Sequence, residues 1–141
     1  PDVTVPIGKA KVVKEGSDVS IVAFSIMVGK ALEASDLLSN EGIEAEVIDL
    51  RTIRPLDVET IIKSVKKTNR IITVEEGWPT CGIGAEISSL VCEEAFDYLD
   101  APVKRVAGVD VPMPYAANLE KLALPQSSDI VSAAKAVCYR S

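Results

Sequence analysis

The sequence predicts an α/β domain of three layers, in which a mixed, mostly parallel five-stranded sheet with one antiparallel strand lies between helices. Short, nearly continuous apolar runs alternate along the chain with longer segments whose apolar residues recur at helical spacing. Strands that alternate with helices imply right-handed crossovers between parallel strands. The 141 residues are 48% hydrophobic and 26% charged, which suits one folded domain over residues 1–141 and argues against disorder.

Five segments have the pattern of strands, because they are short, largely apolar and bounded by turn residues. These segments are 8–14, 19–25, 45–50, 70–75 and 102–107. The first alternates only weakly and ends in the turn 15–18, so we expect it to be the antiparallel strand, at or near an edge of the sheet. The second is apolar almost throughout, which is typical of a strand covered on both faces.

Four segments have apolar residues at helical spacing. They begin near Val28, Asp57, Gly82 and Ser128. The first ends at the stop signal Asn40-Glu41-Gly42. The second has Asp57 near its start and lysines near its end, an order that suits the helix dipole. The third is long, and we take its helical spacing to continue as far as Asp100.

The composition excludes several kinds of chemistry. The chain has no histidine, so it cannot build a Ser-His-Asp or Cys-His nucleophile, a His-ligated zinc site or an imidazole proton shuttle by itself. The three cysteines, Cys81, Cys92 and Cys138, have neither a CxxC nor a metal-ligand spacing. We expect them to be reduced thiols that serve as small apolar residues.

The charge balance favours basic partners. The chain has 21 acidic residues and 15 Lys and Arg, for a net charge of −6. This negative charge argues against nucleic acid as a ligand. The longest near-apolar stretch, Val19–Val28, covers ten residues, against the roughly 20 that a membrane span needs. The chain opens at Pro1 without a charged-then-apolar leader, and we expect it to be a piece of a longer polypeptide.

The glycine-rich segment 75–84 (EEGWPTCGIG) ends a strand and enters a helix N-terminus, where open α/β sheets commonly bind ligands. It lacks both the dinucleotide fingerprint and the P-loop pattern. A turn that lets helix and sheet pack closely is therefore favoured over a phosphate site. Glu75 and Glu76 point to opposite faces and form a poor acid–base pair; one is expected to accept hydrogen bonds from the loop or a neighbouring chain. Trp78 is either a lid on the core or an interface anchor.

The third helix carries a stripe of acidic residues. At 100° per residue, four carboxylates fall within roughly 60° of one another. They are Glu86, Glu93, Asp97 and Asp100, with Glu94 beside them. Like charges at i,i+4 and carboxylates near a helix C-terminus oppose local stability. The stripe is either a solvated face or a docking surface that attracts a basic partner.

Three segments carry a family resemblance: 41–61, 64–87 and 95–120, with the blocks LDAPV and VDVPMPYA as their most specific parts. They resemble the C-terminal domain of the transketolase superfamily, and within it that of the beta subunits of pyruvate dehydrogenase (acetyl-transferring). Together with the first apolar strand and the last helix, the similarity covers nearly the whole chain.

The resemblance implies a piece of an α2β2 enzyme that uses thiamine diphosphate and Mg²⁺ to decarboxylate pyruvate and pass the acetyl group to lipoyl groups. It implies that catalytic, cofactor-binding and metal-binding residues lie outside this chain, that the isolated domain is inactive, and that the enzyme works in the mitochondrial matrix. Two alternatives remain: the same domain of a branched-chain 2-oxo acid dehydrogenase, or a free-standing α/β anion-binding module.

The resemblance also implies partners: the alpha subunit, a second beta subunit, and the basic subunit-binding domain of dihydrolipoyl acetyltransferase. Asp100 is expected to form an ion pair with an Arg or Lys of that domain. The residues expected around it are Asp97, Glu93, Glu94, Ala101 and Pro102. The residues expected at a subunit interface are Trp78, Pro114 and Tyr115.

Overall fold

The structure is a computed structural model that describes residues 6–77, 82–108 and 124–140. In these ranges a five-stranded sheet has the order β1–β3–β2–β4–β5. The strands are β1 (Lys11–Lys14), β2 (Val19–Ala23), β3 (Ala45–Asp49), β4 (Ile71–Val74) and β5 (Lys104–Val106). β1 runs antiparallel to β3, and the other neighbouring pairs are parallel. The predicted mixed sheet with an antiparallel edge strand is confirmed.

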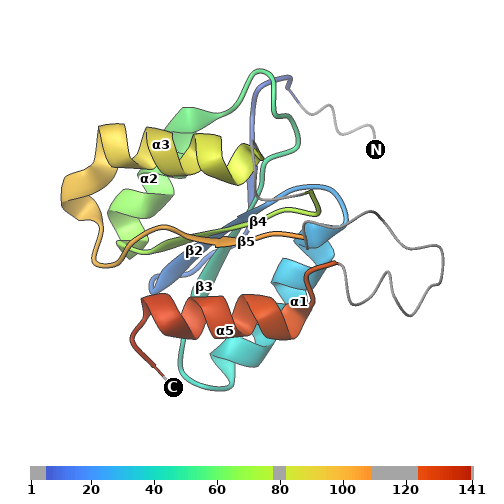
Figure 1. The fold of residues 1–141 in the computed structure, drawn as a ribbon, viewed down its shortest axis with the longest axis vertical. Helices are drawn as coiled ribbons and strands as arrows, with labels where there is room; N and C mark the ends of the chain where they lie inside the picture. Colours follow the sequence, from blue (N-terminus) through green and yellow to red (C-terminus); the bar gives the residue numbers. More distant parts are fainter. Residues whose placement is uncertain (1–5, 78–81, 109–123, 141) are drawn as a thin grey trace.

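Helices cover both faces of the sheet (Figure 1). They are α1 (Met27–Ser39), α2 (Val58–Thr68), α3 (Ile83–Ala95), the 3-10 turn η1 (Phe96–Tyr98) and α5 (Ser127–Val137). α1 and α5 pack on one face, and α2 and α3 pack on the other. Among the helices in the described ranges, none is both long enough and apolar enough to cross a bilayer.

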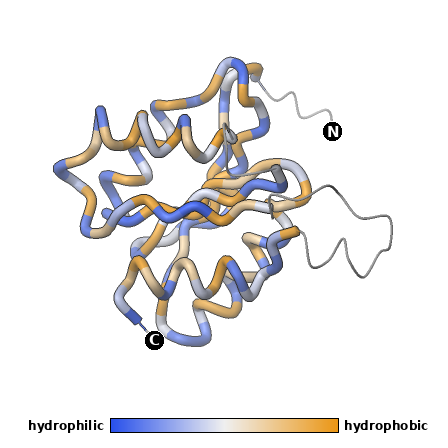
Figure 2. The backbone as a smooth tube through the Cα atoms, viewed as in Figure 1, coloured by the Kyte–Doolittle hydropathy of each residue, from blue (hydrophilic) through white to orange (hydrophobic). Residues whose placement is uncertain are grey.

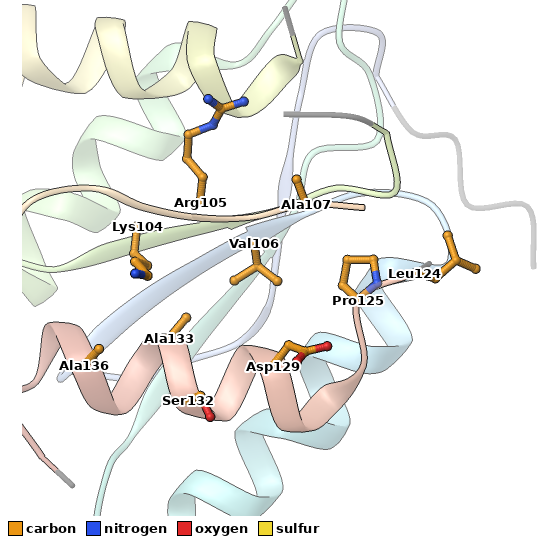
Figure 3. A pocket seen from close by; sticks show the side chains of 10 residues that line it. All are labelled: Lys104, Arg105, Val106, Ala107, Leu124, Pro125, Asp129, Ser132, Ala133 and Ala136. Atoms are coloured by element: carbon orange, nitrogen blue, oxygen red, sulfur yellow. The ribbon is translucent and has the colours of Figure 1, made fainter. Parts of the chain in front are cut away.

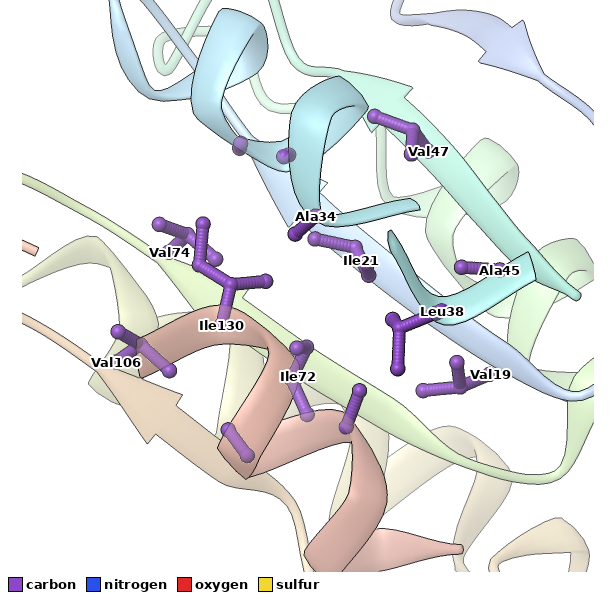
Figure 4. Packing of buried hydrophobic residues seen from close by; sticks show 14 of the residues in the cluster. Val19, Ile21, Ala34, Leu38, Ala45, Val47, Ile72, Val74, Val106 and Ile130 are labelled. Atoms are coloured by element: carbon purple, nitrogen blue, oxygen red, sulfur yellow. The ribbon is translucent and has the colours of Figure 1, made fainter. Parts of the chain in front are cut away.

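The two faces of β2 separate the core into two clusters. Ile21 packs with Leu38 of α1 and Ile130 of α5 (Figure 4), whereas its neighbour Val22 packs with Ile61 of α2 on the other side. All five residues of β2 are buried, because successive side chains of a strand point to opposite faces and both faces are covered. Figure 2 shows hydrophobic residues concentrated in the central sheet and on the helix sides that face it.

A buried polar network joins α2 to the sheet. Glu46 on β3 is only 3% exposed, and its carboxylate accepts hydrogen bonds from Ser64 Oγ (2.6 Å) and Lys67 Nζ (2.6 Å) on α2. Ser64 also shares a hydrogen bond with Ser20 Oγ of β2, which in turn contacts Thr68 Oγ1 at 2.7 Å. Every member of this network thus has a partner, as a buried polar group requires.

Asp57 fastens the start of α2 to the segment before β1. Its carboxylate accepts hydrogen bonds from Thr60 N (3.1 Å) and Thr60 Oγ1 (2.6 Å), which caps the helix, and from Ala10 N (2.8 Å). Burial by itself would raise the pKa of Asp57, but the hydrogen bonds from Thr60 and Ala10 outweigh it and hold the pKa below its ordinary value. The ionised carboxylate therefore stabilises the fold.

Substitution Asp57→Ala should lower the free energy of unfolding by about 1–2 kcal/mol at pH 7, since it removes the helix cap and leaves buried donors unpaired. The contribution of a carboxylate with a lowered pKa is present above its unfolded pKa of about 3.9 and is lost as the pH falls through the folded value. Urea unfolding followed by circular dichroism should therefore show the difference narrowing between pH 5 and pH 3.

The control for this prediction is Asp36→Ala, since Asp36 has a side chain 80% exposed and pairs only with Lys14 among the described residues. It should change the free energy of unfolding by less than about 0.5 kcal/mol. An Asp57→Ala variant no less stable than this control would contradict the capping argument.

Candidate partner-docking surface

Asp100 lies in the segment between η1 and β5, and its main chain is held from two sides. Its N–H donates to the carbonyl of Asn69 (2.8 Å), the residue that follows α2. Its own carbonyl accepts a hydrogen bond from Tyr139 Oη (3.0 Å), beyond the end of α5. The side chain nevertheless remains 57% exposed. A carboxylate is thus presented to solvent from a fixed backbone.

Asn69 connects the end of α2 to the segment that carries Asp100. It ends α2 in the left-handed conformation, with φ of 64°, which Asn adopts more readily than most residues. Its side-chain amide donates to the carbonyl of Tyr98 (2.8 Å). The end of α2 therefore holds both the η1 turn and Asp100.

The other predicted acidic residues lie on exposed surface near this segment. Glu93 and Glu94 are exposed on α3, and Asp97 is exposed in η1. The expectation that one helix continues to Asp100 is wrong, because α3 ends at Ala95 and the chain passes through a 3-10 turn. The 100° spacing therefore does not relate Asp97 and Asp100 to the α3 carboxylates, and the acidic stripe is a helix face followed by a turn.

The two residues after Asp100 differ in their exposure to solvent. Pro102 is exposed. Ala101 is only 7% exposed and packs into the core cluster on the α1 and α5 side of the sheet. The surface predicted for both residues is thus supplied by Pro102, whereas Ala101 anchors the segment to the core.

Sequence reasoning missed the aromatic residues at this end of the molecule. Phe96, Tyr98 and Tyr139 are 66%, 44% and 72% exposed. Lys66 Nζ lies 5.2 Å from the centroid of the Tyr98 ring, within cation–π distance. Tyr139 could not have been linked to Asp100 from local patterns, because 39 positions separate the hydrogen-bonded pair.

Glu75 does accept hydrogen bonds from the segment that follows it, as predicted for one of the two glutamates. It is 3% exposed, and its Oε1 atom lies 3.3 Å from Gly84 N and 3.3 Å from Arg105 Nη2. Figure 3 shows the Arg105 side chain leaving β5 on the opposite side from Lys104 and Val106. Glu76 is half-buried and does not share this site.

This arrangement favours the packing interpretation of the glycine-rich turn over the phosphate site. The N-terminal N–H of α3 at Gly84 already faces the chain's own carboxylate. A Cβ atom at Gly82 or Gly84 would stand 2.6 or 2.8 Å from a Glu75 oxygen. The glycines thus let the start of α3 approach Glu75 closely.

The described residues contain neither a metal site nor a disulfide. No group of three or more His, Cys, Asp and Glu is placed to hold a metal ion within these ranges. Cys92 is exposed, so the expectation of an apolar core role is wrong for it. Cys138 is half-buried, and burial raises the pKa of its thiol. Cys81, Trp78, Pro114 and Tyr115 lie outside the described residues.

A hollow of about 480 Å³ lies between β5 and α5, with Lys104 and Asp129 at its sides and the small residues Ser132 and Ala133 along α5 (Figure 3). Asp100 does not line it.

The fold and the comparisons with known proteins define the class of protein. Residues 8–130 match the family described as "Transketolase, C-terminal domain", and the chain belongs to that family. A solved structure described as "Split gene transketolase, inactive beta4 tetramer" superposes with a TM-score of 0.86 at 34% sequence identity, covering 99% of this chain and 44% of that one.

Within the family, the chain is similar to beta subunits of pyruvate dehydrogenase. It is 66% identical over 136 residues to "Pyruvate dehydrogenase E1 component subunit beta-2, mitochondrial" of Oryza sativa subsp. japonica, covering 96% of this chain and 36% of that protein. The Dictyostelium discoideum mitochondrial beta subunit is 63% identical, with 97% and 38% covered. The Rickettsia felis beta subunit is 61% identical, with 97% and 42% covered.

The chain thus spans about two fifths of the length of these curated relatives. The resemblance to the C-terminal domain of pyruvate dehydrogenase beta subunits is confirmed. The rice and Dictyostelium relatives are named as mitochondrial, whereas another relative comes from Rickettsia felis.

The close contact at Gly84 can be tested by comparing two glycines near helix starts. Helix propensity alone predicts that Gly→Ala stabilises a helix by up to about 1 kcal/mol. Gly84→Ala should instead destabilise the protein by about 1–3 kcal/mol, because the new methyl group would meet Glu75, Thr73 and Arg105. Chemical denaturation of both variants measures this difference.

The matched variant is Gly29→Ala in α1, where no atom beyond the local helix backbone lies within 4 Å of the position that a Cβ atom would occupy. It should keep or raise stability. Equal effects of the two substitutions would show that the packing around Glu75 tolerates a side chain.

Proposed function

We propose that this chain is the C-terminal assembly and docking domain of the beta subunit of a thiamine-diphosphate-dependent pyruvate dehydrogenase. The parent enzyme decarboxylates pyruvate and transfers the acetyl group to lipoyl groups. The proposal is supported by 61–66% identity to subunits that bear this name. These names also favour pyruvate over branched-chain 2-oxo acids as the substrate of the parent enzyme.

The cofactors of the parent enzyme do not fit the described part of this chain. Mg²⁺ takes oxygen ligands, commonly one or two carboxylates together with substrate phosphates and water. The chain has no histidine, and the described residues gather no metal-binding cluster. The helix N-terminus best placed for a phosphate, at Gly84, faces Glu75. We therefore propose that thiamine diphosphate and Mg²⁺ are held by polypeptide outside this chain.

The docking role depends on one observation above all: the exposed carboxylate of Asp100 on a main chain held by Asn69 and Tyr139. Because the main chain is already ordered, binding of a cation by this half-exposed carboxylate costs less backbone entropy than binding by a residue on a free loop would. The neighbouring exposed residues Glu93, Glu94 and Asp97 would add a negative field that speeds encounter with a basic module. The partner is the basic subunit-binding domain of dihydrolipoyl acetyltransferase.

The assembly role concerns an alpha subunit and a second beta subunit in an α2β2 heterotetramer. The structural neighbour with 34% identity is described as a beta tetramer, which supports self-association of related chains. Trp78, Pro114 and Tyr115 remain predicted interface residues. The mitochondrial names of the rice and Dictyostelium relatives support the mitochondrial matrix as the compartment.

Substitution Asp100→Asn should weaken binding of the subunit-binding domain by about tenfold at low salt, because a charge-assisted contact is lost while the shape of the side chain is kept. Isothermal titration calorimetry at two salt concentrations measures the change. The wild-type affinity should itself fall as salt is added.

Asp36→Asn is the charge-matched control, since Asp36 is exposed beside Lys14 of the edge strand β1. It should change the dissociation constant by less than about twofold. An affinity that is independent of salt, or equal in wild type and Asp100→Asn, would exclude the ion pair as the basis of docking.

The isolated chain should not decarboxylate pyruvate when thiamine diphosphate and Mg²⁺ are supplied. Release of labelled carbon dioxide should stay at the rate of a protein-free blank, with an assembled pyruvate dehydrogenase as the positive control. A rate that rises in proportion to the concentration of the chain would refute the non-catalytic assignment.

A further inference from the structure

Asp100 already has a cationic neighbour within its own chain. Arg70 Nη2 lies 3.8 Å from Asp100 Oδ2, with the two side chains 26% and 57% exposed. This separation is about 1 Å longer than a charge-assisted hydrogen bond. No hydrogen bond to the Asp100 carboxylate is found among the described residues. The two groups thus form an ion pair without direct hydrogen bonding.

Arg70 and Asp100 are each also held by other parts of the fold. Arg70 Nε donates to the carbonyl of Val137 at the end of α5 (3.0 Å), and the Arg70 carbonyl accepts from Ser20 N (2.8 Å). Asp100 is held at its N–H by Asn69 and at its carbonyl by Tyr139. Arg70 is thus held through its main chain and its Nε atom, and Asp100 through its main chain, while the two charged groups remain 3.8 Å apart.

Two consequences follow for a partner's cation. The Asp100 carboxylate keeps its capacity to accept a hydrogen bond, since Arg70 does not use it. The positive charge of Arg70 nevertheless stands close enough to oppose a second cation at the same carboxylate. Arg70 therefore lowers the affinity of the site without blocking it.

We propose that Arg70 is an affinity-setting residue of the docking surface: an internal counter-ion that a partner's arginine or lysine must share or displace at Asp100. The inference rests on the proposed docking function. It assigns to Arg70 a role opposite to that of the acidic residues around it, because they attract the basic partner and Arg70 weakens its hold. Docking through Asp100 would thereby remain readily reversible.

The test is the variant Arg70→Gln, titrated with the subunit-binding domain at low and high salt. A glutamine amide can still donate a hydrogen bond, while the positive charge is removed. Binding should tighten about two- to fivefold at low salt, which is the range expected for one exposed charge pair. The gain should shrink at high salt. Unfolding curves should show that the variant folds as the wild type does.

Two further variants separate this role from a general change in charge. Lys11→Gln removes one exposed positive charge from β1, at the other edge of the sheet from β5, and should leave the affinity within about twofold of wild type. In an Asp100→Asn background, Arg70→Gln should no longer tighten binding, since the carboxylate that it neutralises is gone.

The outcomes distinguish the two proposals. If wild type binds and Asp100→Asn weakens binding, but Arg70→Gln leaves it unchanged or weaker, only the role of Arg70 is overturned. An equal gain from Lys11→Gln, or a gain that persists in the Asp100→Asn background, also overturns it. If the wild-type chain does not bind the domain, the docking function fails and the role of Arg70 fails with it.

Discussion

The proposed docking surface depends on the two main-chain hydrogen bonds of Asp100. One comes from the end of α2, at Asn69, and the other from beyond α5, at Tyr139. These helices lie on opposite faces of the sheet, so the main chain that carries the carboxylate is held where both layers meet the edge next to β5. A side chain on a free loop would have to be ordered when a partner binds, at a cost in conformational entropy. Here much of that ordering is already present in the fold.

The charges around Asp100 do not serve local stability. Glu93 and Glu94 lie toward the C-terminal end of α3, where carboxylates oppose the helix dipole. The nearby Asp97 adds a further negative charge, and Arg70 offsets the field at one point only, without a direct hydrogen bond to Asp100. The proposed attraction of a basic partner would account for these acidic groups, whose place near the end of α3 the helix dipole does not favour. Glu75 shows the contrasting case, since it is buried and faces Arg105 and Gly84.

Much of the fold could be predicted because its determinants are local. A few consecutive residues determine each of three features: the apolar run of β2, the charge order of α2 and the stop signal after α1. Gly42 in that stop signal has a φ of 81°, in the left-handed region that favours glycine. The structure of the candidate docking site could be predicted only in part. Asp100 was chosen through resemblance and stays a predicted docking residue. Helical spacing extended α3 too far, because nothing in the pattern marks the change to a 3-10 turn at Phe96. Arg70 was missed, since its contact with Val137 joins residues 67 positions apart.

The polar network under α2 has an effect that reaches the docking surface. A helix shifted by one turn, about 5.4 Å, would separate Ser64 and Lys67 from Glu46 and deprive a buried carboxylate of these partners. The network therefore fixes the position of α2 along its own axis. It thereby also fixes where Asn69, at the end of α2, accepts the hydrogen bond from Asp100 N. Two buried serines and a buried glutamate thereby help to position the exposed segment that carries the proposed docking residue.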